Sequence, residues 1–397
     1  MTIVVDSKNP FLAEALAPFA EARALATAQI TREALAGADG VIIRSETRIG
    51  PALLDGTRVQ FVGTATIGTD HVDLPYLRER GIRFASAPGS NANSVAEYVA
   101  TALLVAAGRL NWKLRGRTLG VVGVGNVGGK VVRVGEALGM TVLQNDPPLA
   151  RKTGAAHFQP LETLMDADIL TLHVPLTGEG EFPTHHLFDR ARIGRMKRGA
   201  LLLNTSRGGV VDTSALVSAL ETGHLAGAIL DVWEREPAID MRLLSLSLLG
   251  TPHIAGYSYD GKVNAARMMF EEVCRHFGWP PAWTPPGMLP PPARENMTID
   301  PAGDAEAVLR AILSACYDIE TDDRALRSLL RESPGDRPDL FRRLRSMYPV
   351  RREFAATRVN AHTDAGDLSG RLTKLGFRVV SHEESEHRMN RGCERTS

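Results

Sequence analysis

The stretch that decides the fold runs from Thr118 to Gly128 and reads TLGVVGVGNVG. Its first part, Thr118–Val124, is almost entirely apolar, which is typical of a parallel strand buried on both faces. Glycines with GxGxxG spacing follow at Gly123–Gly128 and lead into a helical pattern over Val127–Leu138. A strand, a glycine-rich turn and a helix in this order predict the first βα unit of a doubly wound sheet.

Short apolar runs alternate with helical stretches on both sides of this unit, which predicts further parallel βα units. The expected strands are Ile3–Val5, Gly40–Ile43, Gln60–Thr64, Thr141–Leu143, Ile169–His173, Ala200–Asn204 and Ala228–Val232. The expected helices are Asn9–Phe19, Pro51–Leu54, Ser90–Arg109, Pro160–Met165 and Thr213–Thr222.

A proline-dense stretch, Trp279–Pro292, breaks this alternation. Such density stiffens the chain and excludes helix and central strand, so we interpret it as a linker. Beyond it, helical patterns at Asp304–Tyr317 and Leu368–Leu375 and an apolar run at Phe377–Val380 predict a small third domain. The polar, aperiodic tail after Ser381 is expected to be disordered.

Composition limits the function classes. Lys+Arg and Asp+Glu are equal at 46 each, which argues against a whole-chain electrostatic role on nucleic acid or an anionic membrane. The zero net charge does not exclude a local basic pocket that binds a small anion. The 3 cysteines lack CxxC spacing and histidine partners at ligand spacing, so we expect reduced thiols, no metal and a cytoplasmic protein.

The glycine-rich turn is the candidate cofactor site. Free N–H groups and the positive end of the helix dipole at Asn126–Gly128 suit the phosphates of a dinucleotide. Asp146 ends the next expected strand, where a carboxylate can accept bonds from both ribose hydroxyls and repel a 2′-phosphate, which favours NAD over NADP. The alternative is a surface Asp beside a glycine turn without a ligand.

Three further segments place polar residues directly after an apolar strand, at the edge where doubly wound sheets bind ligands. Arg207 precedes two glycines, and its guanidinium fork can hold a carboxylate. Asp231 ends an apolar strand, where a partner such as a nicotinamide carboxamide would rationalise the buried charge. Glu236 follows in the loop, and His253 is flanked by proline and glycine.

The chemistry of alcohol oxidation makes this set coherent, because a base must take the hydroxyl proton while hydride leaves for nicotinamide. Histidine suits that role near neutral pH. We therefore assign His253 as acid/base, Glu236 as its partner and Arg207 as the substrate clamp. The alternatives without function are that Arg207 is a surface arginine in a turn and that His253 is a structural histidine.

Taken together, Gly123–Gly128, Asp146, His173–Thr177, Asn204–Asp212, Asp231–Pro237 and Pro252–Gly256 resemble the D-isomer-specific 2-hydroxyacid dehydrogenases. The resemblance spans about residues 1–280 and matches the family's catalytic Arg, Glu and His to Arg207, Glu236 and His253. It implies an α/β fold with two Rossmann-like doubly wound parallel-sheet domains. A small C-terminal α+β domain that builds a homodimer would complete the chain.

The implied division is a substrate-binding domain from residues 1–91 and 258–280, an NAD-binding domain at 92–257, a linker at 281–292, a dimerisation domain at 293–381 and a disordered tail at 382–397. The implied NAD contacts are Gly123, Gly125, Asn126, Val127, Gly128, Asp146, Val174, Thr205, Ser206, Asp231 and Gly256. The implied substrate contacts are Ser45, Thr66 and Tyr257.

Finer features resemble the branch of this family that oxidises 4-phospho-D-erythronate on one route to pyridoxal phosphate. They include Phe61–Asp73, Ala87–Asn91 and the domain beyond the proline linker. Arg44, beside Ser45, is a candidate for the substrate phosphate, with a salt-bridged strand-end arginine as the equal alternative. Two other functions stay open: oxidation of another 2-hydroxy acid such as 3-phosphoglycerate, and NAD sensing without turnover.

Overall fold

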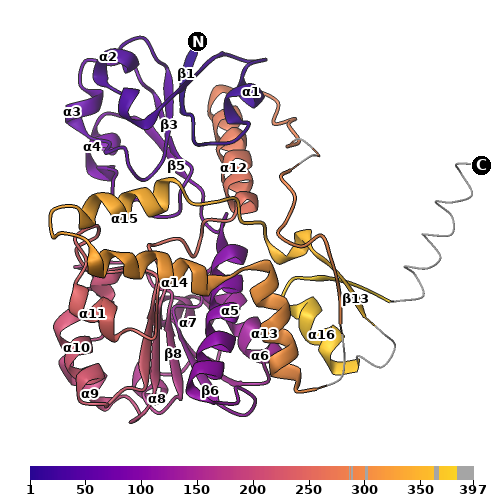
Figure 1. Ribbon diagram of the computed structural model, residues 1–397. Coiled ribbons are helices and arrows are strands. Elements are labelled where there is room, and N and C mark those ends of the chain that lie inside the picture. The colour runs from indigo at the N-terminus through magenta and orange to yellow at the C-terminus, as the bar shows by residue number, and fades with distance from the viewer. Residues whose placement is uncertain (286, 288, 300–302, 362–365, 382–397) are drawn as a thin grey trace, which may run out of the picture. The chain divides into compact units, whose positions relative to one another are not determined.

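The computed structural model describes residues 1–285, 287, 289–299, 303–361 and 366–381 (Figure 1). The expected tail at 382–397 lies outside the described residues. Contacts divide the chain into a first unit, Met1–Ala92 with Ser258–Pro290, and a second unit, Asn93–Tyr257 with Pro291–Ser397. The discontinuity of the first unit arises because the chain returns to it after completing the sheet of the second.

The first unit is a five-stranded sheet in the order β2-β1-β3-β4-β5, in which every pair is parallel. The strands are β1 (Thr2–Asp6), β2 (Glu21–Leu25), β3 (Gly40–Ile43), β4 (Phe61–Thr64) and β5 (Arg83–Ser86). The helices are α1 (Leu12–Leu16), α2 (Arg32–Leu35), α3 (Pro51–Leu54), α4 (Leu74–Glu79) and α12 (Tyr259–Phe277).

Helices cover both faces of this sheet, because its strands are apolar on both. Along β3, Val41 and Ile43 pack in one buried cluster and Ile42 in another on the opposite face. The order 2-1-3-4-5 places a topological switch point between β1 and β3, where doubly wound sheets open a crevice at the carboxyl ends of the strands.

The second unit contains a six-stranded parallel sheet in the order β11-β10-β9-β8-β6-β7. Its strands are β6 (Thr118–Val122), β7 (Thr141–Asn145), β8 (Ile169–Leu172), β9 (Leu201–Asn204), β10 (Gly227–Leu230) and β11 (Leu249–Gly250). Its helices are α5 (Ala92–Leu110), α6 (Gly128–Ala137), α7 (Pro147–Thr153), α8 (Leu161–Leu164), α9 (Arg190–Arg195), α10 (Thr213–Glu221) and α11 (Met241–Leu246). The switch point of this sheet lies between β6 and β8, beside the glycine-rich turn.

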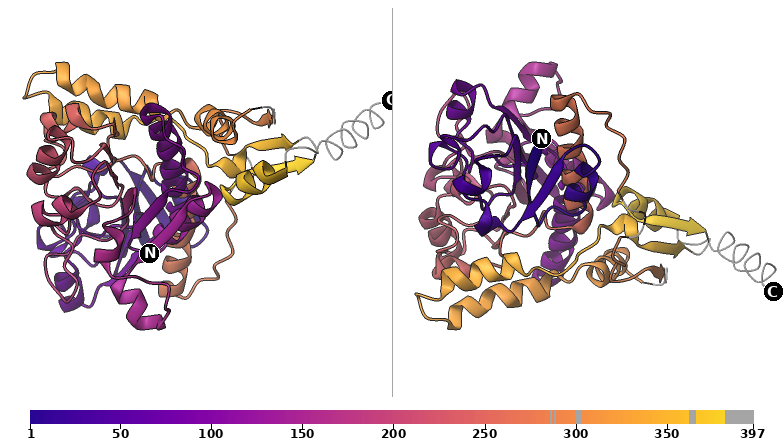
Figure 2. Two further views of the ribbon diagram at one scale, coloured as in Figure 1. Left: turned by 90° about the horizontal axis from the view of Figure 1, so that it is seen from below. Right: turned by 90° about the horizontal axis from the view of Figure 1, so that it is seen from above.

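The segment that follows the proline stretch forms a three-stranded parallel sheet, β12-β13-β14. Its elements are β12 (Asn296–Thr298), α13 (Ala305–Cys316), α14 (Ile319–Arg327), α15 (Arg337–Ser346), β13 (Arg358–Ala361), α16 (Gly366–Lys374) and β14 (Arg378–Ser381). Figure 2 shows β13 and β14 side by side with α16. Leu309, Leu313 and Leu372 share one buried cluster with Val99 and Leu103 of α5, so this segment completes the core of the second unit.

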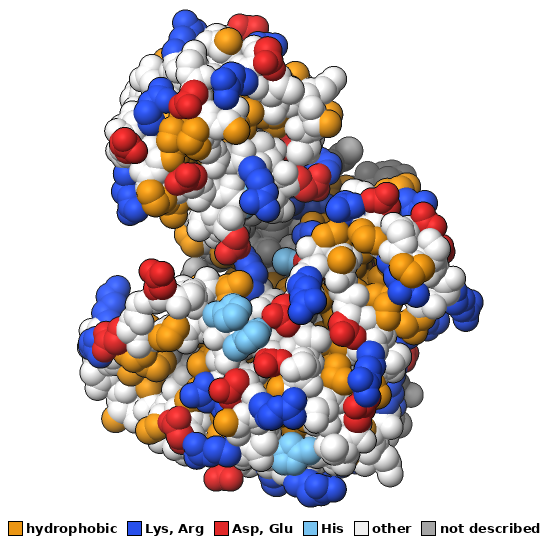
Figure 3. All heavy atoms as spheres, turned by 90° about the vertical axis from the view of Figure 1, so that its left-hand side faces the viewer, with side chains coloured by type: hydrophobic (Ala, Val, Ile, Leu, Met, Phe, Trp, Pro, Cys, Tyr) orange, Lys and Arg blue, Asp and Glu red, His pale blue; other side chains and the backbone are white. Residues whose placement is uncertain are grey.

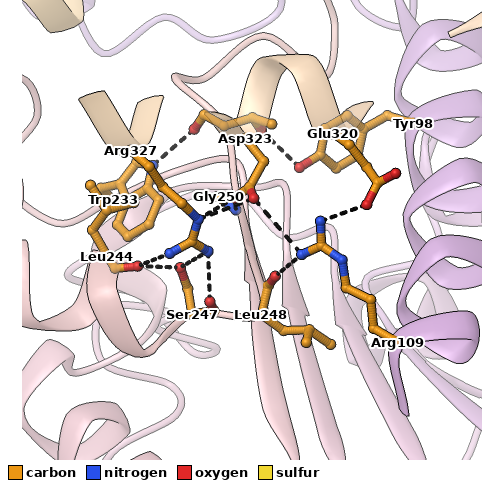
Figure 4. A network of polar contacts seen from close by, with 11 residues as sticks. Tyr98, Arg109, Trp233, Leu244, Ser247, Leu248, Gly250, Glu320, Asp323 and Arg327 are labelled. Atoms are coloured by element: carbon orange, nitrogen blue, oxygen red, sulfur yellow. Dashed lines mark hydrogen bonds and ion pairs between the residues drawn. The ribbon is translucent and has the colours of Figure 1, made fainter. Parts of the chain in front are cut away.

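A polar network fastens α14 to the short edge strand β11 (Figure 4). Arg327 donates through Nε to both oxygens of Asp323 at 3.0 Å and through its two Nη atoms to the carbonyl oxygens of Leu244 and Ser247. Asp323, whose side chain is 5% exposed, accepts from the backbone N–H of Gly250 at 2.8 Å. The edge of the sheet is therefore capped by this carboxylate and covered by a helix.

These sheets confirm the expected fold class of two Rossmann-type sheets and a third, smaller one. The expected helix Asn9–Phe19 is too long, because Phe11 adopts a left-handed conformation and the helix spans only Leu12–Leu16. Sequence patterns missed β2, a largely exposed edge strand whose residues, EARAL, carry no apolar run.

Basic and acidic side chains are interspersed over the face in Figure 3, in keeping with the zero net charge. Within the described ranges, no helix has the length and hydropathy that a membrane span requires.

Candidate functional site

The glycine-rich turn after β6 is shaped by close backbone contacts. Gly123 has φ +84°, and a Cβ there would lie 2.7 Å from the carbonyl oxygen of His173 and 2.8 Å from Cγ1 of Val174. A Cβ on Gly128 would lie 1.9 Å from the carbonyl oxygen of Gly123. A Cβ on Gly125, in contrast, would have no atom of the described residues within 4 Å, apart from those of its chain neighbours. The turn therefore presents bare backbone at a helix start, which fits a dinucleotide pyrophosphate.

Asp146 ties this turn to the helix that follows β7. Its Oδ2 accepts from the backbone N–H of Val124 at 2.8 Å, and its Oδ1 accepts from the N–H of Leu149 at the start of α7. The carboxylate is only partly buried, so it keeps acceptor capacity toward a ligand. The turn residues Asn126 and Val127 lie between Gly125 and the start of α6; Asn126 is exposed, and Val127 is partly buried against the core.

His173 links the ends of two neighbouring strands, a role that its sequence motif did not reveal. Its Nε2 lies 2.9 Å from Oγ1 of Thr171, and its Nδ1 lies 3.2 Å from Oγ1 of Thr205. Burial lowers the pKa of His173 to about 3, so the ring is neutral at physiological pH. A neutral imidazole can accept from one hydroxyl and donate to the other, which joins the end of β8 to Thr205, directly after β9.

The segments that carry Arg207, Glu236 and His253 follow β9, β10 and β11, which are adjacent parallel strands. The first two segments touch, since a Cβ on Gly208 would lie 2.0 Å from the backbone carbon of Trp233. Arg207 is partly buried and donates from Nη1 to the carbonyl oxygen of Ser206 at 2.8 Å. Ser206 in turn donates to Oδ1 of Asn204, which fixes the start of the loop.

Glu236 and His253 form the polar pair that the sequence reasoning assigned to each other. Nδ1 of His253 lies 2.7 Å from Oε2 of Glu236, and Oε1 of Glu236 accepts from the N–H of Trp233 at 2.8 Å. Burial alone would raise the pKa of Glu236, but the neighbouring His253 and these hydrogen bonds outweigh it and lower the pKa. The carboxylate is therefore ionised, and the imidazole keeps Nε2 for other partners.

Asp231 is the centre of the loop that carries His253, and the structure gives it partners within the chain. Its Oδ1 accepts from Oγ1 of Thr251 at 2.6 Å and from the N–H of Ile254 at 2.8 Å, while Oδ2 accepts from the N–H of Ala255 at 2.9 Å. The side chain is 1% exposed, and burial raises its pKa. These hydrogen bonds offset the cost of burying the Asp231 carboxylate. The sequence analysis expects a nicotinamide carboxamide in that role, and the structure shows partners within the chain.

His253 itself adopts φ +58°, a left-handed conformation that a non-glycine residue holds only under constraint. The constraint comes from both sides of the loop. Thr251 is bonded to Tyr98 of α5 at 2.7 Å and accepts through its carbonyl oxygen from Nε1 of Trp233 at 2.9 Å. None of these supporting roles could be inferred from residue types alone.

The remaining sequence-predicted residues are divided between the units. Ser45 follows β3 and is exposed, and Thr66 follows β4, where its Oγ1 lies 2.7 Å from Oγ1 of Thr64. Both belong to the first unit. Gly256 and Tyr257 belong to the second unit and follow His253 in its loop, partly exposed.

One cluster with metal-binding residue types was not anticipated from sequence. Ligand atoms of His185, His186 and Glu234 lie within 4.8 Å of one another, and His186 is bonded to Glu234 at 2.9 Å. The same Glu234 accepts from the N–H of Thr213. The cluster is thus tied into the loop between β10 and Glu236, where a histidine–carboxylate pair suffices to explain it.

Comparisons with known proteins agree with this geometry. Residues 96–255 match the family described as D-isomer specific 2-hydroxyacid dehydrogenase, NAD binding domain, and residues 288–376 match a family described as a domain of unknown function. The D-lactate dehydrogenase from Aquifex aeolicus, solved with NAD and lactic acid, superposes with a TM-score of 0.58 at 29% identity, over 70% of this chain and 96% of its own.

Two relatives that align with most of this chain have the same name. Erythronate-4-phosphate dehydrogenase from Salinibacter ruber is 46% identical over 89% of this chain and 92% of its own length. The Cronobacter sakazakii protein of that name is 42% identical over 96% of this chain and 99% of its own length. On this likeness, which extends through both units, the chain belongs to the erythronate-4-phosphate dehydrogenase family of NAD-dependent D-2-hydroxyacid dehydrogenases.

Proposed function

We propose that this protein oxidises the 2-hydroxyl of 4-phospho-D-erythronate to 2-oxo-3-hydroxy-4-phosphobutanoate, with NAD as hydride acceptor, on a route to pyridoxal phosphate. The observation that carries the proposal is the pairing of His253 with Glu236 at 2.7 Å, in loops that follow adjacent strands beside the Arg207 loop. Relatives that share the family name support the choice of substrate.

Each of the three side chains has a distinct task in this reaction. Nε2 of His253 takes the hydroxyl proton, while Glu236 holds the ring through Nδ1 and balances the charge that the imidazole gains. Arg207 binds the substrate carboxylate and stabilises negative charge on the oxygen that becomes the carbonyl. NAD, when bound, supplies the hydride acceptor.

The cofactor would lie on the turn from Gly123 to Gly128, with Asp146 beside the adenosine ribose. Open space above Gly125 and the bare backbone of the turn fit a pyrophosphate. Val174, Thr205, Ser206 and Gly256 are proposed to complete the site. Asp231 is proposed to act through the loop that it orders.

Three further assignments extend the proposal. Ser45, Thr66 and Tyr257 are assigned to the substrate by their match to the family pattern. The C-terminal segment is assigned to a homodimer, and exposed apolar side chains such as Met347 and Val350 are suited to such a contact. A cytoplasmic location follows from the expected reduced thiols.

One assay tests the proposal against its alternatives. Purified protein with NAD is offered 4-phosphoerythronate, 3-phosphoglycerate and D-lactate in turn, and NADH absorbance is followed. We expect turnover with 4-phosphoerythronate far above the other two. Preference for another acid would replace the substrate assignment, and tight NAD binding without turnover on any acid would favour an NAD sensor.

A further inference from the structure

A cation from the C-terminal segment lies against the loop that carries His253. Arg345, near the end of α15, donates from Nη2 to the hydroxyl of Tyr257 at 3.1 Å. Its guanidinium carbon also lies 5.6 Å from the centre of the Tyr257 ring. Tyr257 is the residue of this loop that the resemblance to the family assigns to substrate binding, so Arg345 lies next to a predicted substrate contact.

The positive charge of Arg345 is not neutralised by a direct ion pair. Across the described ranges, no carboxylate lies within 4.0 Å of its guanidinium nitrogens, whereas Arg342 on the same helix pairs with Asp339. Its Nε is buried and has no hydrogen-bond partner among the residues that the structure describes. A buried donor without a partner costs free energy, and a bound anion would remove that cost.

The charge acts on the catalytic pair as well as on Tyr257. Arg345 is one of the groups that lower the pKa of Glu236, although it ranks behind His253 and the hydrogen bonds. Two roles are therefore consistent with its position. It could serve only to hold Glu236 and Tyr257, or it could present an anion-binding donor set to the substrate.

The chemistry of the proposed substrate decides between them. A phosphate monoester offers three acceptor oxygens and close to two negative charges, and a guanidinium whose Nε has no hydrogen-bond partner can donate to it. The D-lactate dehydrogenase, which is named for a substrate without phosphate, covers only 70% of this chain. A cation supplied by an added segment is what a phosphorylated substrate would require.

We propose that Arg345 binds the phosphate of the substrate and that the C-terminal segment thereby selects phosphorylated over unphosphorylated 2-hydroxy acids. The proposal rests on the proposed function for the identity of the acid, but not for the presence of an anion site. It also differs from the sequence expectation for Arg44, which lies in the first unit and reaches Oδ1 of Asn9 at 3.5 Å.

The test compares full-length variants with wild type on two substrates, 4-phosphoerythronate and D-erythronate. The variants are Arg345→Gln, Arg345→Lys and Arg44→Gln, with Arg343→Gln, exposed on the same helix, as the matched control. Loss of one charged donor pair predicts that Arg345→Gln lowers the ratio of kcat/KM values, phosphorylated over unphosphorylated, about 10- to 100-fold. Arg345→Lys should lower it less, and Arg343→Gln should leave it within about twofold.

A parallel fall of kcat/KM on both acids in Arg345→Gln would overturn the proposal, because that pattern marks a residue that only holds the loop. A fall of the ratio in Arg44→Gln but not in Arg345→Gln would overturn it too.

Binding of inorganic phosphate to the NADH complex, followed by calorimetry, separates this proposal from the function itself. If wild type fails to oxidise 4-phosphoerythronate, the proposed function fails. Weaker phosphate binding in Arg345→Gln than in Arg343→Gln would still support the anion site, and equal binding would overturn it.

Discussion

Arg351 donates a hydrogen bond from Nη2 to the carbonyl oxygen of Ala255, two residues beyond His253. The same nitrogen reaches Oγ of Ser94 and, at 3.3 Å, the carbonyl oxygen of Ile254. Arg351 is 7% exposed, and its guanidinium lies 4.3 Å from the centre of the Tyr317 ring. A segment remote in sequence from the loop that carries His253 thus fixes the carbonyl groups that follow His253.

Replacing Arg351 with methionine should therefore damage both stability and turnover. The change leaves buried carbonyl oxygens without a charged donor, which costs about 2–4 kcal/mol in the free energy of unfolding. Because His253 is held at φ +58° by its surroundings, we also expect kcat to fall about tenfold or more. Urea denaturation and steady-state kinetics measure the two effects, with Arg343→Met as the exposed control. Normal kcat in the folded variant would show that the loop does not need this support.

The pair formed by His253 and Glu236 predicts an ordered set of kinetic losses. His253→Ala should lower kcat at least about 1000-fold while NAD still binds, because it removes the proton acceptor and leaves the glycine-rich turn intact. Glu236→Gln should lower kcat about 10- to 100-fold, since the amide cannot balance the charge on the protonated ring. Glu234→Gln, two residues earlier and bonded to His186, is the control and should stay within about threefold. Most of the activity surviving in His253→Ala would remove that residue from its assigned role.

Sequence alone predicted the pairing of Glu236 with His253, because the carboxyl ends of parallel strands meet at one edge of a sheet. Arg207, Glu236 and His253 each follow an apolar strand that could be recognised from its pattern. The residues and backbone groups that hold these loops in place could not be predicted in the same way. The partners of Asp231 are backbone N–H groups that become available only in the folded loop, and Arg351 and Arg345 come from a segment whose periodicity says nothing of what it packs against.

Cofactor choice is predicted to depend on the charge of Asp146. Asp146→Asn keeps one acceptor oxygen, for Val124 or for Leu149 but not for both, and removes the charge that would repel a 2′-phosphate. Asp146→Ala also removes the cap of α7, which costs about 0.5–2 kcal/mol. We expect both variants to bind NAD more weakly and to lower the ratio of kcat/KM for NAD over NADP about tenfold or more. An unchanged ratio in both would exclude Asp146 from discriminating between the cofactors.

Asp322 on α14 should make stability depend on pH in a direction opposite to that of an ordinary carboxylate. Burial raises its pKa to about 6, against hydrogen bonding from the Tyr348 hydroxyl at 2.9 Å. The folded chain therefore holds this proton more tightly than the unfolded chain, whose carboxyl titrates near 3.8. The stability it contributes is complete below about pH 4 and is lost as pH rises through about 6.

Asp322→Asn cannot ionise, so it should escape this loss. Relative to wild type, the variant should gain about 1–2 kcal/mol in the free energy of unfolding between pH 4.5 and pH 7, less than the full shift would give because the side chain is partly exposed. Asp318→Asn is the matched control of opposite sign. Burial alone would raise the pKa of Asp318, but hydrogen bonds from Thr321 outweigh it and lower the pKa, so this variant should lose stability relative to wild type as pH rises from the acid range. Urea denaturation at these two pH values measures the effect at Asp322, and the same measurement extended below pH 4.5 measures the effect at Asp318. A wild-type-like pH dependence in Asp322→Asn would show that Asp322 does not titrate near pH 6.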